Sequence, residues 1–536
     1  MKASALVRCA IVPALFAIAG ALAVPGVAAA ATWRMALGNA DSRSAVISTD
    51  GAWVAFDSEA SDLVSDDTNA SSDVFVADRA TGDLELVSVS SGGELGNALS
   101  EEAGLSGDGR YVVFRSNASN LVAGDTNDTG DIFLHDRLTG TTVRVSVSSS
   151  GGQANGASSG AYISADGRYV AFYSEATNLV SGDTNHKNDI FVHDMLTGTT
   201  KRVSVRASST QANSDSFLPV LSANGRYVAF FSYASNLVSG DTNKRADVFV
   251  RDLTTKVTSR VSVTSSERQY AKSDSRYASI SADGRYVAFQ SGPTGTTDGQ
   301  TDIYVRDRKA GTTKRISGDS FGHKANGWSF SPSISANGRY VAYMSLATNL
   351  VPADTNDVGD IFTFDRSTGV VTRVSVDSAA AQVDGDGRTG TPSAISGDGR
   401  YVAFQATWDW VDEWNRIDGV FVCDTAGLPA QHLVSSPIAP SVMKHAKSYT
   451  VFGYLKPRHM TGSISVLIYL DRKNSSGTWV PKGYVTARVS DYSSYSKYAT
   501  SVKLPTTGKW RLRAYAPADA EHAEMWSIGY DHVTVK

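Results

Sequence analysis

The sequence repeats itself seven times between residues 45 and 436. A turn motif of the form Asp/Asn-Gly-Arg-Tyr, or Asp-Gly-Ala-Trp in the first copy, marks each repeat, and the spacings are 58, 58, 58, 59, 54 and 61 residues. A fixed period of this length means that one supersecondary unit stacks on copies of itself. The first residue of the motif is Asp50, Asp108, Asp166, Asn224, Asp283, Asn337 and Asp398 in the seven copies.

Each copy predicts four short strands and no helix. In the third copy the strands are expected at 161–164, 169–173, 189–194 and 200–205, because turn signals separate these runs. Both alternating positions of the run 169–173 are apolar, so both faces of that strand should be covered. Seven four-stranded units buried on both faces predict an all-β chain whose main body, residues 32–436, is a seven-bladed β-propeller.

The connections within a copy alternate between tight and long. The first and third connections are Asp-Gly and Thr-Gly turns, whereas the second and fourth, such as 174–188 and 206–220, run to about 15 residues. In an up-and-down blade the two long connections emerge at the same end. We therefore expect function on this long-loop face of the propeller.

The repeat resembles that of the TolB-type propellers. Ser-Ala-Asp-Gly-Arg-Tyr-Val-Ala-Phe at 164–172 and Asp-Ile-Phe-Val-His-Asp at 189–194, followed by Thr-Gly, carry the resemblance. The chain departs from the family pattern by having Ala or Gly where the family has Pro, and by its long polar loops. Members of that broad class include periplasmic interaction proteins and propellers attached to some peptidases, so the resemblance implies fold and export more than an activity.

Five copies carry the loop Asp-Thr-Asn-x-x-x-Asp, whose side-chain oxygens are hard ligands that suit Ca²⁺. That ion takes about six to eight oxygens, so backbone carbonyls and water would have to complete the shell. The same residue types brace turns by bonding nearby backbone, and near-identical copies favour bracing; no cofactor is required. The candidate metal ligands are Asp67, Asn69, Asp73, Asp125, Asn127, Asp131, Asp183, Asn185, Asp189, Asp241, Asn243, Asp247, Asp354, Asn356 and Asp360.

The fifth and seventh copies have abandoned this loop. In the seventh it contains three Trp with acidic and amide neighbours, a composition suited to stacking on sugar rings or gripping a protein. Alternatively, the Trp cluster folds under its own loop and seals the junction between the last and first blades. Nearby loops add Phe321, Phe330, Arg268, Tyr270 and Arg276. The predicted ligand-binding residues are Trp408, Asp409, Trp410, Trp414, Arg416, Trp328 and His323.

Residues 1–31 have the layout of a secretory signal peptide. Lys2 and Arg8 precede an apolar run at 9–24, and small residues follow at 28–31. No later segment approaches the roughly 18 apolar residues that a membrane span needs, so we expect a secreted or envelope-associated protein without a transmembrane span. Cys423 would be the single thiol of the mature chain, and we interpret it as inert.

The last part of the chain differs in composition from the propeller. After a linker at 437–448, residues 449–536 alternate as six or seven strands, which predicts a small immunoglobulin-like β-sandwich. Its motifs, such as Leu-Pro-Thr-Thr-Gly-Lys-Trp-Arg-Leu-Arg at 504–513, resemble an accessory domain of exported actinobacterial proteins. Residues 441–536 carry 14 Lys and Arg against six Asp and Glu, with nine Tyr and three Trp. Such a basic, aromatic domain favours an anionic polymer, and for an exported protein the cell wall is the nearest one; the alternative is that these residues only decorate strand faces.

Two functions are compatible with these observations. The first is a non-enzymatic, monomeric binding protein whose long-loop face engages a protein or glycan and whose tail attaches to the cell wall; nucleic acid suits the charge but not the compartment. The second is a secreted polysaccharide hydrolase that uses pairs of Asp or Glu on the same face. The spacing of residues within the sequence does not show which carboxylates would pair across blades.

Overall fold

A computed structural model shows how the seven repeats are assembled. It describes residues 32–36, 38–293, 300–351, 354, 356, 358–376, 393–408, 417–427, 430–431, 433–434, 439–445, 447–456, 465–491, 496–516, 522–523, 525–526 and 531–536. Within these residues there is no helix that is both long enough and apolar enough to cross a membrane. The predicted signal peptide lies outside them.

The propeller prediction is confirmed, with four strands in each of seven blades. The third blade consists of β10 (Ser158–Ile163), β11 (Tyr169–Ser174), β12 (Asp189–Asp194) and β13 (Thr199–Arg202), all antiparallel. The first, second, fourth, fifth and sixth blades repeat this order. Their strands are β2 (Ser42–Ile47), β3 (Trp53–Ser58), β4 (Asp73–Asp78), β5 (Leu84–Leu86); β6 (Ser100–Leu105), β7 (Tyr111–Ser116), β8 (Asp131–Asp136), β9 (Thr141–Arg144); β14 (Ser216–Leu221), β15 (Tyr227–Ser232), β16 (Asp247–Asp252), β17 (Val257–Arg260); β18 (Ser273–Ile280), β19 (Tyr286–Pro293), β20 (Asp302–Asp307), β21 (Thr312–Arg315); β22 (Ser329–Ile334), β23 (Tyr340–Ser345), β24 (Asp360–Asp365) and β25 (Val371–Arg373).

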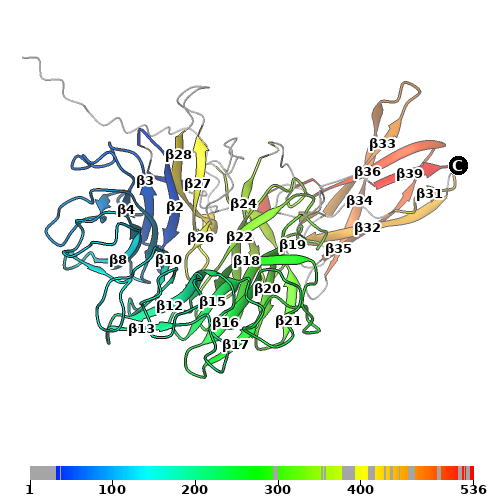
Figure 1. Cartoon of the computed structure of the whole chain (residues 1–536). Coiled ribbons are helices and arrows are strands. Elements are labelled where there is room, and N and C mark those ends of the chain that lie inside the picture. Colours follow the sequence, from blue (N-terminus) through cyan, green and yellow to red (C-terminus); the bar gives the residue numbers. More distant parts are fainter. Residues whose placement is uncertain are drawn as a thin grey trace, which may run out of the picture.

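The first strand of each blade lies innermost. The strands β2, β6, β10, β14, β18, β22 and β26 (Ala394–Ile395) contact one another around the ring, so they line the central channel. The chain runs along each of these strands from the long-loop face towards the tight Asp/Asn-Gly turn. Figure 1 shows the blades side by side, with the first blade (blue) next to the last (yellow).

Aromatic side chains hold the blades together. Within the third blade, Phe172 and Phe191 are fully buried and stack with ring centroids 5.8 Å apart, and most other blades repeat this pair. Burying one such ring contributes roughly 1.5–3 kcal/mol. Between blades, the aromatic residue that opens each second strand packs on the turn glycine of the next blade, as Tyr111 does on Gly167.

The chain's first described strand closes the ring. In the seventh blade, β27 (Tyr401–Trp408) and β28 (Ile417–Asp424) pair with each other, and the fourth strand is β1 (Thr32–Ala36), with Thr32 opposite Cys423. One sheet thus joins the two ends of the propeller segment, which prevents the last blade from separating from the first. Cys423, opposite Thr32 in this sheet, is fully buried in a cluster with Met344 and Ile361 of the sixth blade.

The tail is all-β, as predicted. A short 3-10 helix (Thr425–Gly427) follows the last blade, and strands at 430–434 already pair with tail strands. The strands are β29 (Ala430–Gln431), β30 (Leu433–Val434), β31 (Val442–Met443), β32 (Ser448–Lys456), β33 (Ser465–Lys473), β34 (Trp479–Asp491), β35 (Ser496–Lys503), β36 (Gly508–Ala516), β37 (His522–Ala523), β38 (Met525–Trp526) and β39 (Asp531–Val535).

One hydrogen-bonded sheet connects most of the tail strands, and β33 occupies its middle, between β34 and β36. Residues from seven strands nevertheless share a single buried cluster around Trp510 and Tyr498, so the sheet must fold over on itself. The division into the two separate sheets of an immunoglobulin-like sandwich stays a prediction.

Candidate functional site at the channel mouth

Six of the seven inner strands, all but β26, are interrupted by a β-bulge near the long-loop face in the described residues. In the third blade the register shifts between Ser159 and Tyr162, and Gly160 adopts a left-handed conformation with φ of +64°. The other described copies place a non-glycine residue in this conformation, which costs about 1–3 kcal/mol and is typical of functional sites. These residues are Ser44, Glu102, Leu218, Tyr277 and Ser331.

A buried hydrogen-bond network fixes the start of each inner strand. In the third blade, the hydroxyl of Ser158 donates to Ser174 Oγ at 3.0 Å, and Ser174 Oγ donates to the carbonyl of Ala157 at 2.9 Å. Both serines are fully buried. The same serine pair recurs in five other blades. It fixes the backbone next to each of these bulges.

The bulge positions vary between copies, although most of the repeat does not. Where the third blade has Ser159 and the facing Tyr173, the first has Arg43 and Asp57, and the fourth has Phe217 and Phe231. By contrast, the adjoining Val-Ala-Phe segment is almost unchanged around the ring. The side chains at this ring of bulge positions therefore differ from blade to blade, while the strand segment beside them stays the same.

The first two blades form an acidic sector of the mouth. The carboxylate of Glu102 accepts a hydrogen bond from the backbone N–H of Gly160 at 2.7 Å, and Glu101 forms an ion pair with Arg115. Burial raises the pKa of Asp57 to about 6, although Ser44 and the backbone of Glu102 hydrogen-bond its carboxylate. Burial also raises the pKa of Glu102.

Arg43 ties this sector to the neighbouring loops. Its guanidinium contacts Asp41 at 2.8 Å and Glu59 at 3.0 Å. Both contacts are partly exposed, so they orient the side chain more than they stabilise the fold.

The third, fourth and fifth blades form an aromatic sector. Phe217 lies 5.3 Å from the ring of Tyr173, edge to face, and 5.5 Å from the ring of Phe231. The rings of Tyr233 and Tyr277 follow at 6.2 and 6.4 Å from Phe231. Tyr233 and Tyr277 are 39% and 42% exposed, so this cluster presents aromatic surface to solvent.

The two sectors adjoin each other. Glu102 in the second blade is bonded to Gly160 in the third, next to Tyr173, and the nearby negative charge contributes to raising the pKa of Tyr173, for which burial is the larger cause. At the far side, the guanidinium of Arg276 lies 5.4 Å above the ring of Tyr233. The mouth thus combines carboxylates, cations and apolar ring faces within one ring of positions.

Two of the predicted binding residues lie on described loops of the long-loop face. Trp328 is 44% exposed and packs on Phe330, a bulge residue of the sixth blade, at 5.8 Å. His323 is exposed, and its Nδ1 atom lies 2.7 Å from Oδ2 of Asp319. The predicted role of these residues in binding remains a prediction.

The predicted seventh-blade platform is described only in part. The backbone of Trp408 ends β27, opposite Ile417. Asp409, Trp410, Trp414 and Arg416 lie outside the described residues. Their role as a binding platform stays a prediction.

The Asp-Thr-Asn loops show a bracing geometry. In the third blade, Asn185 Nδ2 donates to Asp189 Oδ2 at 2.9 Å and to the carbonyl of Ala212 at 3.0 Å, and its Oδ1 accepts the N–H of Lys187. Asp189 also accepts a hydrogen bond through Oδ1 from the buried Ser204 hydroxyl. Among the described residues, no group of three or more His, Cys, Asp or Glu is arranged to hold a metal.

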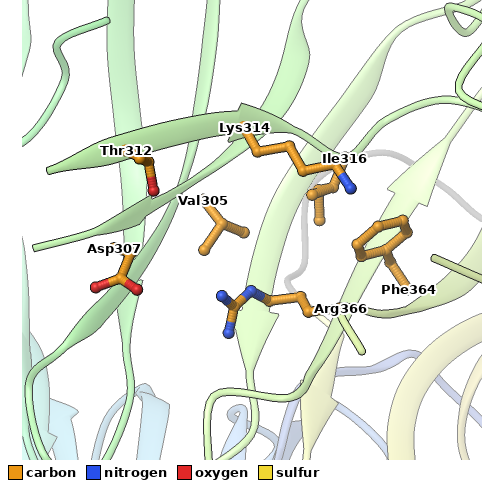
Figure 2. Close-up of a pocket in the computed structure, with 7 residues that line it drawn as sticks. All are labelled: Val305, Asp307, Thr312, Lys314, Ile316, Phe364 and Arg366. Atoms are coloured by element: carbon orange, nitrogen blue, oxygen red, sulfur yellow. The ribbon is translucent and has the colours of Figure 1, made fainter. Parts of the chain in front are cut away.

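A small pocket of about 130 Å³ lies between the fifth and sixth blades (Figure 2). Its polar groups are already engaged, since Asp307 pairs with Arg285 at 2.7 Å and Arg366 stacks on Tyr286 at 3.7 Å. It sits at the tight-turn end of the strands, away from the channel mouth. Val305, Asp307, Thr312, Lys314, Ile316, Phe364 and Arg366 line it.

Most residues of the mouth escaped the sequence-based prediction. The sequence pattern places Arg276 and Phe330 on loops near the predicted platform, but it does not single out Asp57, Glu102 or Tyr277. The signal that could have found them is the alignment of the seven copies with one another, because these positions vary within an otherwise regular pattern. The bulges themselves have no sequence signature, since Ser, Glu, Leu and Tyr as well as Gly adopt the left-handed conformation there.

Comparisons with known proteins add little beyond the fold. No protein-family profile matches this chain, and no curated protein sequence does. A candidate TolB from Agrobacterium tumefaciens is 16% identical, with a TM-score of 0.35, over 63% of this chain and 93% of its own. Prolyl oligopeptidase B from Galerina marginata is 12% identical, with a TM-score of 0.38, over 76% of this chain and 49% of its own. A superoxide reductase from Ignicoccus hospitalis matches 19% of this chain, with 15% identity and a TM-score of 0.14.

Proposed function

We propose that this chain is a non-enzymatic binding protein of the cell exterior, with the channel mouth as its ligand site. The observation that carries the proposal is the ring of bulge positions, where an acidic sector adjoins an exposed aromatic sector. Aromatic faces supply apolar contact area, and carboxylates at their edge accept hydrogen bonds from hydroxyl or amine groups. Glycans and protein loops both offer this combination.

The tail supports attachment to an anionic polymer. On its surface, Trp479 lies between two cations, with Lys473 5.6 Å and Arg511 5.0 Å from its ring, and His532 packs on it at 5.6 Å. A cation beside an aromatic ring is suited to bind an anionic, sugar-containing chain. We therefore propose that the tail binds the cell wall while the propeller holds its ligand.

Reciprocal variants separate the two binding roles. The chain lacking residues 1–31 is tested for binding to a panel of soluble glycans and to proteins of the envelope, and for pelleting with purified cell walls at low and high salt. The double variant Tyr233→Ala, Tyr277→Ala should lose ligand binding but still pellet. The double variant Lys473→Ala, Trp479→Ala should stop pelleting and keep the ligand. Tyr484→Ala removes an exposed tyrosine of the tail. It is the control for the Tyr233→Ala, Tyr277→Ala variant and should keep ligand binding.

A second candidate function is polysaccharide hydrolysis, which the acidic sector favours. A carboxyl group with a pKa near 6, as in Asp57, suits a general acid, and Glu101 or Glu102 would be the second carboxylate. Release of reducing ends from a glycan panel, abolished by Asp57→Asn, would establish hydrolysis. No release by the wild-type protein, together with measurable glycan binding, would leave the binding function.

A further inference from the structure

In four blades an arginine from the fourth strand lies between the two carboxylates of the Asp-Thr-Asn loop. In the third blade, Arg202 Nη1 is 3.0 Å from Asp183 and 3.3 Å from Asp189. All three side chains are at least nine-tenths buried, so the guanidinium compensates two carboxylates that have left water. The corresponding arginines are Arg144 in the second blade, Arg260 in the fourth and Arg373 in the sixth, each within 3.4–3.7 Å of its two carboxylates.

The first blade keeps both carboxylates but lacks the arginine. Leu86 occupies the position of Arg144, 58 residues earlier, while Asp67 and Asp73 are retained. Leu95 likewise replaces Gln153, whose amide donates to Asp125 and Asp131 in the second blade. A leucine side chain ends about where the δ-carbon of an arginine lies, so nothing on the first blade's fourth strand reaches the carboxylates with a donor.

Asp67 is left as a buried carboxylate without compensation. It is 6% exposed, and neither of its oxygens makes a hydrogen bond of ordinary geometry in the described part of the chain; the nearest donor is the backbone N–H of Asn69. Burying a charge without a partner is costly. Asp73, fully buried, accepts hydrogen bonds from Ser88 and from Asn69 at 2.7 Å but has no cation beside it.

The loop has also gained a negative charge at this point. Asp66 stands where the second, third and fourth blades have a glycine, as in Gly124. Its side chain is exposed, beside the buried Asp67. The first-blade loop therefore has Asp66 in addition to the two repeated Asp residues and no arginine opposite them, where the second, third, fourth and sixth blades have the two repeated Asp residues and one arginine.

We propose that a hard divalent cation, with calcium as the ion to test, binds in the first blade at the place that arginine occupies in the others. The carboxylates of Asp67 and Asp73 supply the charge, and backbone carbonyls and water complete the shell. Two carboxylates supply fewer oxygen ligands than most calcium sites have. The Kd should therefore fall in the range of extracellular calcium modules, about 10⁻⁴–10⁻³ M. The site would brace one blade and would not depend on the ligand at the channel mouth.

Titration calorimetry and thermal unfolding of the chain lacking residues 1–31 test this proposal. With CaCl₂ we expect one binding site per chain and a rise in Tm, because an ion that binds only the folded state stabilises that state. Asp67→Asn should weaken binding at least tenfold. Leu86→Arg should restore the guanidinium, abolish calcium binding and raise the Tm measured without calcium. MgCl₂ in place of CaCl₂, at equal ionic strength, shows whether the site selects calcium.

A variant in another blade tests the same idea by gain of a site. Arg202→Leu removes the cation between the two carboxylates of the third blade, as in the first, and Gln211 there bonds Thr184. We expect a second calcium site in this variant. Unchanged calcium affinity in both Asp67→Asn and Leu86→Arg, or no heat and no rise in Tm at about 10 mM calcium, ten times the weakest expected Kd, would overturn the proposal. If Leu86→Arg does not fold, Asp67→Asn and Arg202→Leu decide.

Discussion

Gly51 in the first blade lies against the ring of Tyr401 in the last, so closely that a Cβ atom on Gly51 would come within 2.4 Å of Tyr401 Cδ2. This contact, together with the pairing of β1 and β28, closes the ring. Six equivalent contacts join the other blades, each between a turn glycine and an aromatic ring. The repeated Gly is therefore needed for two reasons, the left-handed turn and the space for the neighbouring ring.

We predict that Gly51→Ala destabilises the propeller more than Gly82→Ala. Both glycines have similar φ, +73° and +76°, so both variants incur the left-handed strain of about 1–2 kcal/mol. A Cβ on Gly82 meets nothing within 4 Å, whereas on Gly51 it meets Tyr401 and adds about 1–3 kcal/mol of overpacking. Urea unfolding of both variants measures the difference, and equal losses would show that the ring contact is unimportant.

Asp57 should make the stability of the protein depend on pH. Burial raises its pKa in the folded state from 3.8 to about 6, so the folded state binds the proton more tightly and this contribution to stability is lost as the pH rises from about 4 to 6. Asp57→Asn should therefore be more stable than the wild type at pH 7.5, by about 1–3 kcal/mol, with the difference shrinking towards pH 5. Asp360, also raised to about 6, is unchanged in both proteins and cancels in the comparison. A difference independent of pH would contradict the assignment.

Cys423 should be unreactive in the folded protein. It is fully buried in a cluster shared with the sixth blade, and burial raises the pKa of its thiol to about 11. In the chain lacking residues 1–31, where it is the single cysteine, a thiol reagent at pH 8 should react only after unfolding. Rapid reaction of the intact folded protein at that pH would contradict the burial of this thiol.

Asn185→Ala tests the bracing role of the Asp-Thr-Asn loops. The variant removes the donors to Asp189 and to the carbonyl of Ala212, leaving the buried Asp189 with one hydrogen bond fewer, and should lower the free energy of unfolding by about 1–3 kcal/mol. Asn213→Ala, whose exposed Nδ2 donates to Ser235 Oγ, is the control and should cost less. Chemical denaturation measures both, and equal effects would argue against a special bracing role.

The sequence alone was sufficient for the blades themselves. The period of about 58 residues, the Asp/Asn-Gly turns and the two-sided apolar strands such as 169–173 depend on local backbone preferences and on burial, both of which leave a pattern in consecutive residues. The observed bounds of β12 match the prediction, and β11 is one residue longer than predicted. The outer bounds were less accurate, since β10 spans 158–163 where 161–164 was predicted and β13 spans 199–202 where 200–205 was predicted.

Only the tertiary structure decided which residues meet. The closure by β1 joins Thr32 to Cys423, 391 positions apart in the chain. The channel mouth gathers Glu102, Tyr173 and Tyr277 from three blades, and the structure alone shows that Asp67 is buried. These contacts depend on the packing of whole blades against one another. Residues that are neighbours in the sequence carry no record of such packing.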